Sequence, residues 1–311
     1  MRNTTDVLRR AFDSTLANWP LIAIRIAENF VLVMIVIVSI VAAVVPVVVA
    51  AGMSHFDFTR GEEPADVIAT LAVEHWVLIL YILGIVTLVL AVLIAIHAFV
   101  DAGSARVFID AERSAGPTPA NRNAFRAFNI DRWLQGGRGS WWSVFWIYNI
   151  VWGVGGLIII IPLMLTLVLM FIVTDTSGRV VAACGGLFFT FLIGLPLAIL
   201  LALITQKAIA ITVARSAAAT ASVRLGWREI RADFGRHLAV AFIVFVIMIG
   251  GAMVISLFTA PVSFVRSIGS APFASIAFAP TQIISSIAQT VFSAAVGLWF
   301  LAAYVEMTEE R

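Results

Sequence analysis

The sequence contains very little cysteine and lysine. Cys184 is the only cysteine among 311 residues, so the chain can form neither an internal disulfide nor a metal site built from several thiolates. Because Cys184 stands in an apolar run, we expect it to be a buried and unreactive thiol. Lys207 is the only lysine, and all other basic side chains, histidines aside, are arginines.

Charge is also scarce. Only 12% of the residues are charged and 61% are hydrophobic, whereas about one quarter of a soluble domain is charged. The mean hydropathy of +1.04 therefore predicts a membrane protein. The net charge is only +2, which does not favour nucleic-acid binding. The first apolar run begins near Leu21 and is much longer than the apolar part of a signal peptide, so no cleavable signal is expected.

Motifs for catalysis or metal binding are absent as well. The four histidines, His55, His75, His97 and His237, include no pair at the four-residue spacing of a helical metal site, and we expect them to be solvated at the membrane surface. The run Gly136–Gly139 lacks the lysine of a phosphate-binding loop, and no Gly-x-Ser-x-Gly motif occurs. The sequence thus predicts no enzyme, no metal and no cofactor.

Long apolar runs dominate the chain. A bilayer span needs roughly 20 predominantly apolar residues, and six runs are long enough. These predicted spans are residues 21–53, 75–100, 141–173, 180–204, 238–258 and 281–305. We therefore expect an all-α integral membrane protein, with residues 1–311 forming a single polytopic domain.

The arginines predict how the spans are oriented. They are concentrated before the first span and in the second and fourth loops, while the first loop is acidic and the third and fifth loops hold one arginine each, Arg179 and Arg266. Lys and Arg are retained on the cytoplasmic side of a membrane. Both termini are therefore expected in the cytoplasm.

Short amphipathic segments precede the odd-numbered spans. Val7–Leu16 and Leu225–Phe234 each place apolar residues on one face with arginines on the other, and Phe125–Phe128 leads to Trp133 and Leu134 in a similar way. Such segments lie in the headgroup plane, on the cytoplasmic side. Their spacing suggests a threefold internal repeat of helix-hairpin units.

A second similarity concerns the ends of the even-numbered spans. Ile96–Arg106 and Thr205–Arg215 both continue a span into small residues and an arginine, so we expect spans two and four to extend into the cytoplasm as helices. Two explanations stay open: a true repeat, or the general similarity of segments that leave a membrane.

The layout resembles known families. The chain resembles YciC-like bacterial six-span proteins in four features: an N-terminal amphipathic helix, the sequence Asn18-Trp19-Pro20, six spans and arginine-rich inner loops. It is also similar to the membrane domain attached to some glycerophosphodiester phosphodiesterases. The resemblance covers nearly the whole chain and implies a six-span membrane fold in a bacterial inner membrane. It transfers no catalytic residue, because the chain has no phosphodiesterase domain.

Polar and small residues inside the spans are the candidate functional positions. Arg25 and Glu28 are three residues apart near the cytoplasmic end of span one, which favours an interfacial ion pair over a transport site. Asn149 is expected to hydrogen bond across helices. The glycines of spans three and five are expected to allow close helix packing rather than to form flexible kinks. These glycines are Gly153, Gly155, Gly156, Gly250 and Gly251.

Span six carries a polar stripe formed by Gln282, Ser286, Gln289 and Ser293. Unpaired amides in hydrocarbon are costly, so the stripe should face the bundle. Interhelical hydrogen bonds and a polar-lined cavity opening outward both stay open. The preceding apolar segment 260–280 contains Pro261, Pro272 and Pro280 and cannot form a regular seventh span; we expect a cap on the outer face, with a re-entrant element left open.

Two function classes follow. The first, which the sequence favours, is a non-enzymatic membrane component that acts as a scaffold or partner subunit of a membrane or envelope assembly. Its expected partners are membrane lipids and another membrane protein, or a second copy in a homo-oligomer. The second class is a transporter or lipid-handling channel that uses the span-six stripe.

Overall fold

Helices form all the regular structure in the described part of the chain. The structure is a computed structural model that describes residues 2–53, 76–173, 175–257 and 272–310. Its elements are α1 (Thr4–Ala17), α2 (Pro20–Met53), α4 (Trp76–Ala115), the 3-10 helix η1 (Arg122–Phe125), α5 (Ile130–Ile172), α6 (Thr176–Arg215), α7 (Ala219–Ala232), α8 (Phe234–Leu257) and α10 (Pro272–Glu309). Among the described residues, six helices are long and apolar enough to cross a membrane. The predicted all-α, six-span membrane fold is confirmed.

Several helices are longer than a bilayer requires. α4 and α6 each contain 40 residues, or about 60 Å at 1.5 Å per residue, whereas the hydrocarbon core is about 30 Å thick. The prediction that spans two and four continue as helices beyond the membrane is confirmed. α4 stops at Gly116, whose φ of +68° lies in the left-handed region that commonly terminates helices.

Two of the three expected interfacial helices exist as separate elements. α1 includes Val7–Leu16, and α7 includes most of the predicted Leu225–Phe234 segment, although Phe234 already belongs to α8. The middle prediction is wrong, because Trp133 and Leu134 lie in the first turns of α5. The side chain of Asn129 accepts hydrogen bonds from the N–H groups of Asp131 and Arg132, so a capped helix begins here and continues into the span.

Proline has less effect on the last span than expected. α10 begins at Pro272, which suits the first turn of a helix, and continues through Pro280. The prediction that Pro272 and Pro280 break the chain is therefore wrong, and residues 272–280 belong to α10. Residues 258–271 lie outside the described part of the chain, so the expected outer cap stays a prediction.

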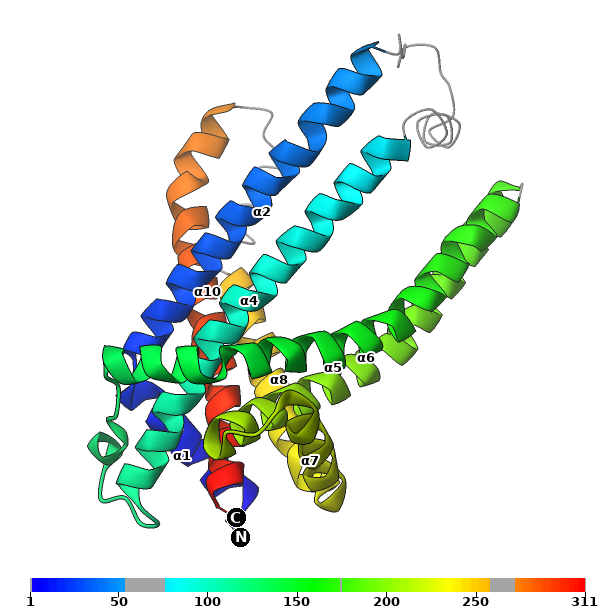
Figure 1. The fold of residues 1–311 in the computed structure, drawn as a ribbon. Helices are drawn as coiled ribbons and strands as arrows, with labels where there is room; N and C mark the ends of the chain where they lie inside the picture. The colour runs from blue at the N-terminus through cyan, green and yellow to red at the C-terminus, as the bar shows by residue number, and fades with distance from the viewer. Residues whose placement is uncertain (1, 54–75, 174, 258–271, 311) are drawn as a thin grey trace. The chain divides into compact units, whose positions relative to one another are not determined.

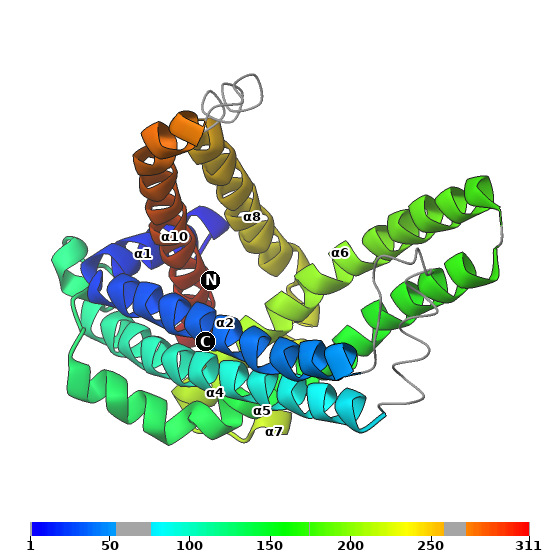
Figure 2. The same cartoon turned by 90° about the horizontal axis from the view of Figure 1, so that it is seen from above.

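The chain divides into two compact units, residues 27–97 and residues 1–26 with 98–311. In the first unit, α2 and the membrane part of α4 run side by side (Figures 1 and 2). In the second unit, α5 and α6 form a hairpin, α7 packs on α6, and α10 contacts α1, α6 and α8. The ends of α1 and α10 lie together, near the N and C labels in Figure 1.

The well-packed core belongs to the second unit and lies outside the most apolar parts of the spans. It includes Val7, Phe108, Ile209, Ile230 and Tyr304, contributed by α1, α4, α6, α7 and α10 respectively. By contrast, at most 17% of the most apolar window of any candidate span is buried. The helices of this unit are thus held together mainly at one end.

Candidate functional site

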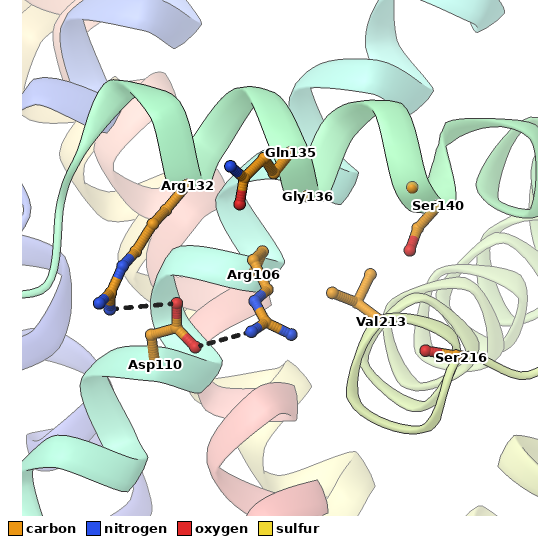
Figure 3. Close-up of a pocket in the computed structure, with 9 residues that line it drawn as sticks. Arg106, Asp110, Arg132, Gln135, Gly136, Ser140, Val213 and Ser216 are labelled. Atoms are coloured by element: carbon orange, nitrogen blue, oxygen red, sulfur yellow. Dashed lines mark ion pairs between the residues drawn. The ribbon is translucent and has the colours of Figure 1, made fainter.

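A polar pocket lies between α4, the start of α5 and the end of α6 (Figure 3). Its volume is about 440 Å³. The residues that line it are Arg106, Asp110, Arg132, Gln135, Gly136, Gly139, Ser140, Val213 and Ser216. Two arginines face one aspartate, so the lining carries a net positive charge.

Close contact between α4 and α5 positions these arginines. A Cβ added at Gly136 would lie 2.4 Å from Arg106 Cβ, and one added at Gly137 would lie 2.7 Å from Phe99 Cζ. On α4, a Cβ added at Gly103 would lie 2.6 Å from Trp133 Nε1. Glycine at these three positions therefore lets the two helices approach. Gly139 differs, because an added Cβ there would meet nothing within 4 Å.

Asp110 positions the arginines without using up their donors. Its carboxylate oxygens lie 3.4 Å from Arg106 Nη2 and 3.7 Å from Arg132 Nη1. Strong charge-assisted hydrogen bonds are about 2.7–2.9 Å long. Figure 3 shows both guanidinium groups turned toward Asp110 from the two helices. The N–H donors of both groups are therefore available to an anion.

A larger basic pocket of about 860 Å³ lies beside α1 and includes Arg2, Arg10 and Arg122. Arg9 also lines it, but the other three arginines are already engaged, Arg2 by Glu306. Arg10 donates to Glu112 at 2.6 Å and to the backbone oxygens of Gly116 and Pro117, and Arg122 donates to Asp13 at 3.0 Å. The smaller pocket is therefore the better candidate for an anion.

An ion-paired cluster ties both ends of the chain together in the second unit. Glu306, which is fully buried, pairs with Arg2 and lies 3.2 Å from Arg10 Nε. Arg10 also pairs with Glu112 of α4. Arg113, which follows Glu112 in the sequence, donates two hydrogen bonds to Glu309, at 2.7 and 3.0 Å. Arginines that the sequence analysis used only as topology signals thus join α1, α4 and α10.

Glu310 extends these contacts to α8. Arg236 Nη2 donates to Glu310 at 2.6 Å, and the backbone N–H of Arg2 donates to its other oxygen. Burial acts to raise the pKa of Glu310, but the two hydrogen bonds and the charge of Arg236 outweigh it. The pKa of Glu310 therefore lies below its ordinary value, and this carboxylate is stabilised in its charged form.

The only lysine is completely buried. Lys207 Nζ lies 3.0 Å from Glu229 of α7 and donates to Thr308 Oγ1 at 2.9 Å and to the backbone oxygen of Met307 at 3.2 Å. Arg215 lies 3.4 Å from the same glutamate. Lys207 thereby connects α6, α7 and the end of α10.

The two ionisable residues predicted in span one each have a partner on α4. In the second unit, Arg25 pairs with Asp101, which also accepts a hydrogen bond from the Tyr148 hydroxyl. In the first unit, Glu28 is buried and one of its carboxylate oxygens lies 2.6 Å from His97 Nδ1. The predicted Arg25–Glu28 pair stays a prediction. The His97 side chain keeps 38% of its surface exposed, in keeping with the expected solvation, but its ring also contacts a carboxylate.

The span-six stripe is placed mostly on the open side of α10. Within the larger unit Ser286 and Ser293 are exposed and Gln289 is half-buried, while the Gln282 side chain lies outside the described part. Next to the stripe, Ala294, Leu298 and Leu301 are buried. The stripe therefore runs along the border of the buried face, and its predicted role stays a prediction.

Three other predictions have definite outcomes. Cys184 is exposed, so the expected burial is wrong; α6 packs mainly against α5 at this level and leaves its other side open. Asn149 donates to the Phe145 oxygen of its own helix at 2.8 Å rather than across helices. His237 is buried, with Nδ1 2.9 Å from the Asp233 oxygen, so it is not solvated.

Sequence reasoning missed the pocket and the buried ion pairs. No family model, curated protein or solved structure matches this chain. One signal was present in the sequence: Glu306, Glu309 and Glu310 are concentrated at the end of an otherwise apolar helix. Acidic residues there, in a chain with arginine-rich inner segments, indicate intramolecular pairing.

Proposed function

We propose that this protein is a non-enzymatic membrane component that scaffolds or partners another membrane or envelope protein, or a second copy of itself. The observation that supports this proposal is that its spans present small and polar faces that their own unit leaves uncovered. We also propose a bacterial inner membrane with both termini cytoplasmic, on the basis of the arginine distribution and the family resemblance.

The glycines of the spans provide the first support. An added Cβ at Gly155 would lie 2.2 Å from Leu201, and one at Gly251 would lie 2.1 Å from Phe292, so these two glycines pack within the chain. A Cβ added at the neighbouring Gly153, Gly156 or Gly250 would meet nothing within 4 Å. Small residues let membrane helices approach closely, so these open positions are suited to helices of a partner.

The stripe on α10 provides the second support. Ser286 and Ser293 are exposed within their unit, and the hydroxyl of neighbouring Thr290 is hydrogen bonded to the Ser286 carbonyl of the same helix. Hydroxyls and amides are not well solvated by hydrocarbon. Another helix with polar groups at this depth would satisfy them.

Ion pairs at one end of the second unit hold the helices of such a scaffold together. Glu306 with its arginine partners and Lys207 with Glu229 fix the ends of α1, α6, α7 and α10 relative to one another. The spans that emerge from this base bury little of their surface in the chain itself. Their outer surfaces are thus available for lateral contacts while their bases stay fixed.

Lipid handling is a second candidate, supported by an apolar groove of about 190 Å³ between α6, α8 and α10. Ala202, Phe242, Phe245, Met248 and Phe300 are among its lining residues. A groove of this composition suits an acyl chain. This candidate requires transport activity from the purified protein alone.

Photo-crosslinking in membranes tests the proposal. A benzoylphenylalanine at Ser293 or Gly156 should capture a protein partner in intact cells. Matched controls are Ile284 and Ile158, which are exposed and lie on roughly the opposite helix faces, at about 100° per residue. They should give only lipid adducts.

The identity of each adduct decides between the outcomes. A defined protein attached at Ser293 and Gly156 supports a partner role, and an adduct with this chain itself supports a homo-oligomer. Equal crosslinking at the control positions would contradict a specific face. No protein adduct at either test position, together with lipid or solute movement in reconstituted vesicles, would favour the second candidate.

A further inference from the structure

We propose that the pocket formed by Arg106, Arg132 and Ser140 binds a phosphate group, and that the source is the headgroup of an anionic membrane lipid. This inference stands apart from the partner role, because it concerns a pocket outside the spans and a different kind of ligand. The positive lining of this pocket and the hydrogen-bond donors around it support the proposal.

The donors around the pocket match a phosphate group. Two guanidinium groups, the Gln135 amide, and the Ser140 and Ser216 hydroxyls border the same cavity. The two guanidinium groups lie 3.4 and 3.7 Å from Asp110, which is longer than a charge-assisted hydrogen bond. Guanidinium forks suit the geometry of phosphate oxygens, and hydroxyls donate to them as well. The volume of about 440 Å³ is large enough for a small phosphorylated group.

The position of the pocket along α5 favours a lipid source. Ser140 is followed directly by Trp141 and Trp142, and Trp146 lies one turn further on. Trp142 and Trp146 are exposed, and aromatic side chains of this kind are enriched at headgroup depth. The pocket therefore lies where the polar end of a lipid meets the protein.

Of the two glycines that line the pocket, Gly139 supports binding rather than simple helix packing. At Gly136, the space that a Cβ would fill is taken by the Cβ and Cγ of Arg106, so this glycine serves the contact between α4 and α5. Gly139 lines the cavity, and an added Cβ would meet nothing within 4 Å. A side chain at residue 139 would fill the pocket without disturbing the crossing of α4 and α5.

The test measures lipid binding to the purified protein in neutral detergent, by native mass spectrometry and titration. The probes are a short-chain phosphatidylglycerol, a short-chain phosphatidylcholine and inorganic phosphate. The wild type should bind phosphatidylglycerol in preference to phosphatidylcholine. The double variant Arg106→Gln/Arg132→Gln should lose affinity by about tenfold or more, because charge-assisted hydrogen bonds of this strength are removed.

Two further variants separate a pocket from a diffuse charge effect. Arg126→Gln/Arg138→Gln removes two exposed arginines that do not line the pocket, and it should keep wild-type affinity. Gly139→Leu leaves the charge unchanged and should weaken binding as strongly as the arginine double variant. Circular dichroism and thermal unfolding should show that all these variants are folded.

The outcomes are distinct. Equal losses in the two double variants, or full affinity in Gly139→Leu, would overturn the pocket. Equal binding of phosphatidylcholine, or no binding of any probe by the wild type, would overturn it too. Inorganic phosphate binding that depends on Arg106 and Arg132, without any preference for phosphatidylglycerol, would keep the phosphate site but overturn the lipid source.

Discussion

Lys207 Nζ lies 3.0 Å from Glu229 Oε2, and both side chains are almost completely removed from solvent. Removing one partner of a buried ion pair leaves an uncompensated charge, whereas replacing both partners by apolar groups is often tolerated. This pair connects α6 to α7 at the end of the molecule where the core is best packed. The free energy of this ion pair therefore affects how firmly α6 and α7 are held together.

We predict that Lys207→Met destabilises the protein by about 3–5 kcal/mol, because the buried Glu229 loses the cation that lies 3.0 Å away, while Arg215 lies at 3.4 Å. Adding Glu229→Leu should restore a large part of the loss. Thermal unfolding in detergent measures both effects. Arg224→Gln, at an exposed position on α7, is the control and should change stability little. A Lys207→Met protein as stable as the Arg224→Gln control would contradict the prediction.

Asn18 is predicted to be the residue that fixes the junction of α1, α2 and the segment before α5. Its side chain is fully buried, donates to the oxygens of Ser14 and Phe125, and accepts from the N–H groups of Ala127 and Phe128. Asn18→Ala should cost about 1–3 kcal/mol for each backbone group left unsatisfied. Limited proteolysis should then cleave the segment before α5 faster, while Asn123→Ala, at an exposed position, should leave it protected.

Neighbouring glycines on α8 should respond oppositely to a methyl group. An alanine Cβ at Gly251 would lie 2.1 Å from the Phe292 ring, whereas at Gly250 it would meet nothing within 4 Å. Gly251→Ala should therefore lower stability in detergent by about 1–3 kcal/mol, as expected for overpacking. Gly250→Ala should be neutral in the purified protein. Equal thermal stability of the two variants would refute the α8–α10 contact.

The Glu310 contacts predict a dependence on pH. Because the pKa of Glu310 is lowered below its ordinary value of 4.5, its charged form stabilises the folded state above that pH. The stabilisation is lost as the pH falls through the lowered value. The wild type should therefore be more stable than Glu310→Gln at pH 7, and this difference should shrink in the acid range. A difference that stays constant from pH 7 to the acid range would argue against the Arg236 contact.

The orientation can be tested by labelling single cysteines in a Cys184→Ser background. Reagents applied from outside should modify cysteines placed near Glu62 and Ser177 and spare those near Arg122 and Arg228, because loops rich in arginine stay cytoplasmic. Permeabilised cells should label all four positions, which shows that each cysteine is reactive. If reagents applied from outside label only the cysteines near Arg122 and Arg228, the topology is the reverse of the predicted one.

Local composition determined much of the architecture. Six apolar runs predicted six spans, and the polar segments Val7–Leu16 and Leu225–Phe234 predicted two short helices, because length and helical periodicity are properties of neighbouring residues. The extension of α4 and α6 beyond the membrane was also visible in the sequence. The middle interfacial helix was misjudged, since the cap at Asn129 begins a helix that continues into the span.

Only the tertiary structure decided which polar groups meet. Arg10 and Glu112 are 102 residues apart, Lys207 and Glu229 pair across two helices, and Arg106 and Arg132 border one pocket because Gly103, Gly136 and Gly137 let α4 approach α5. The sequence determined how many spans the chain forms and which segments are amphipathic. The tertiary structure decided the ion pairs and the pocket, because a charge or a hydroxyl is recognised only by groups that packing brings within a few ångströms.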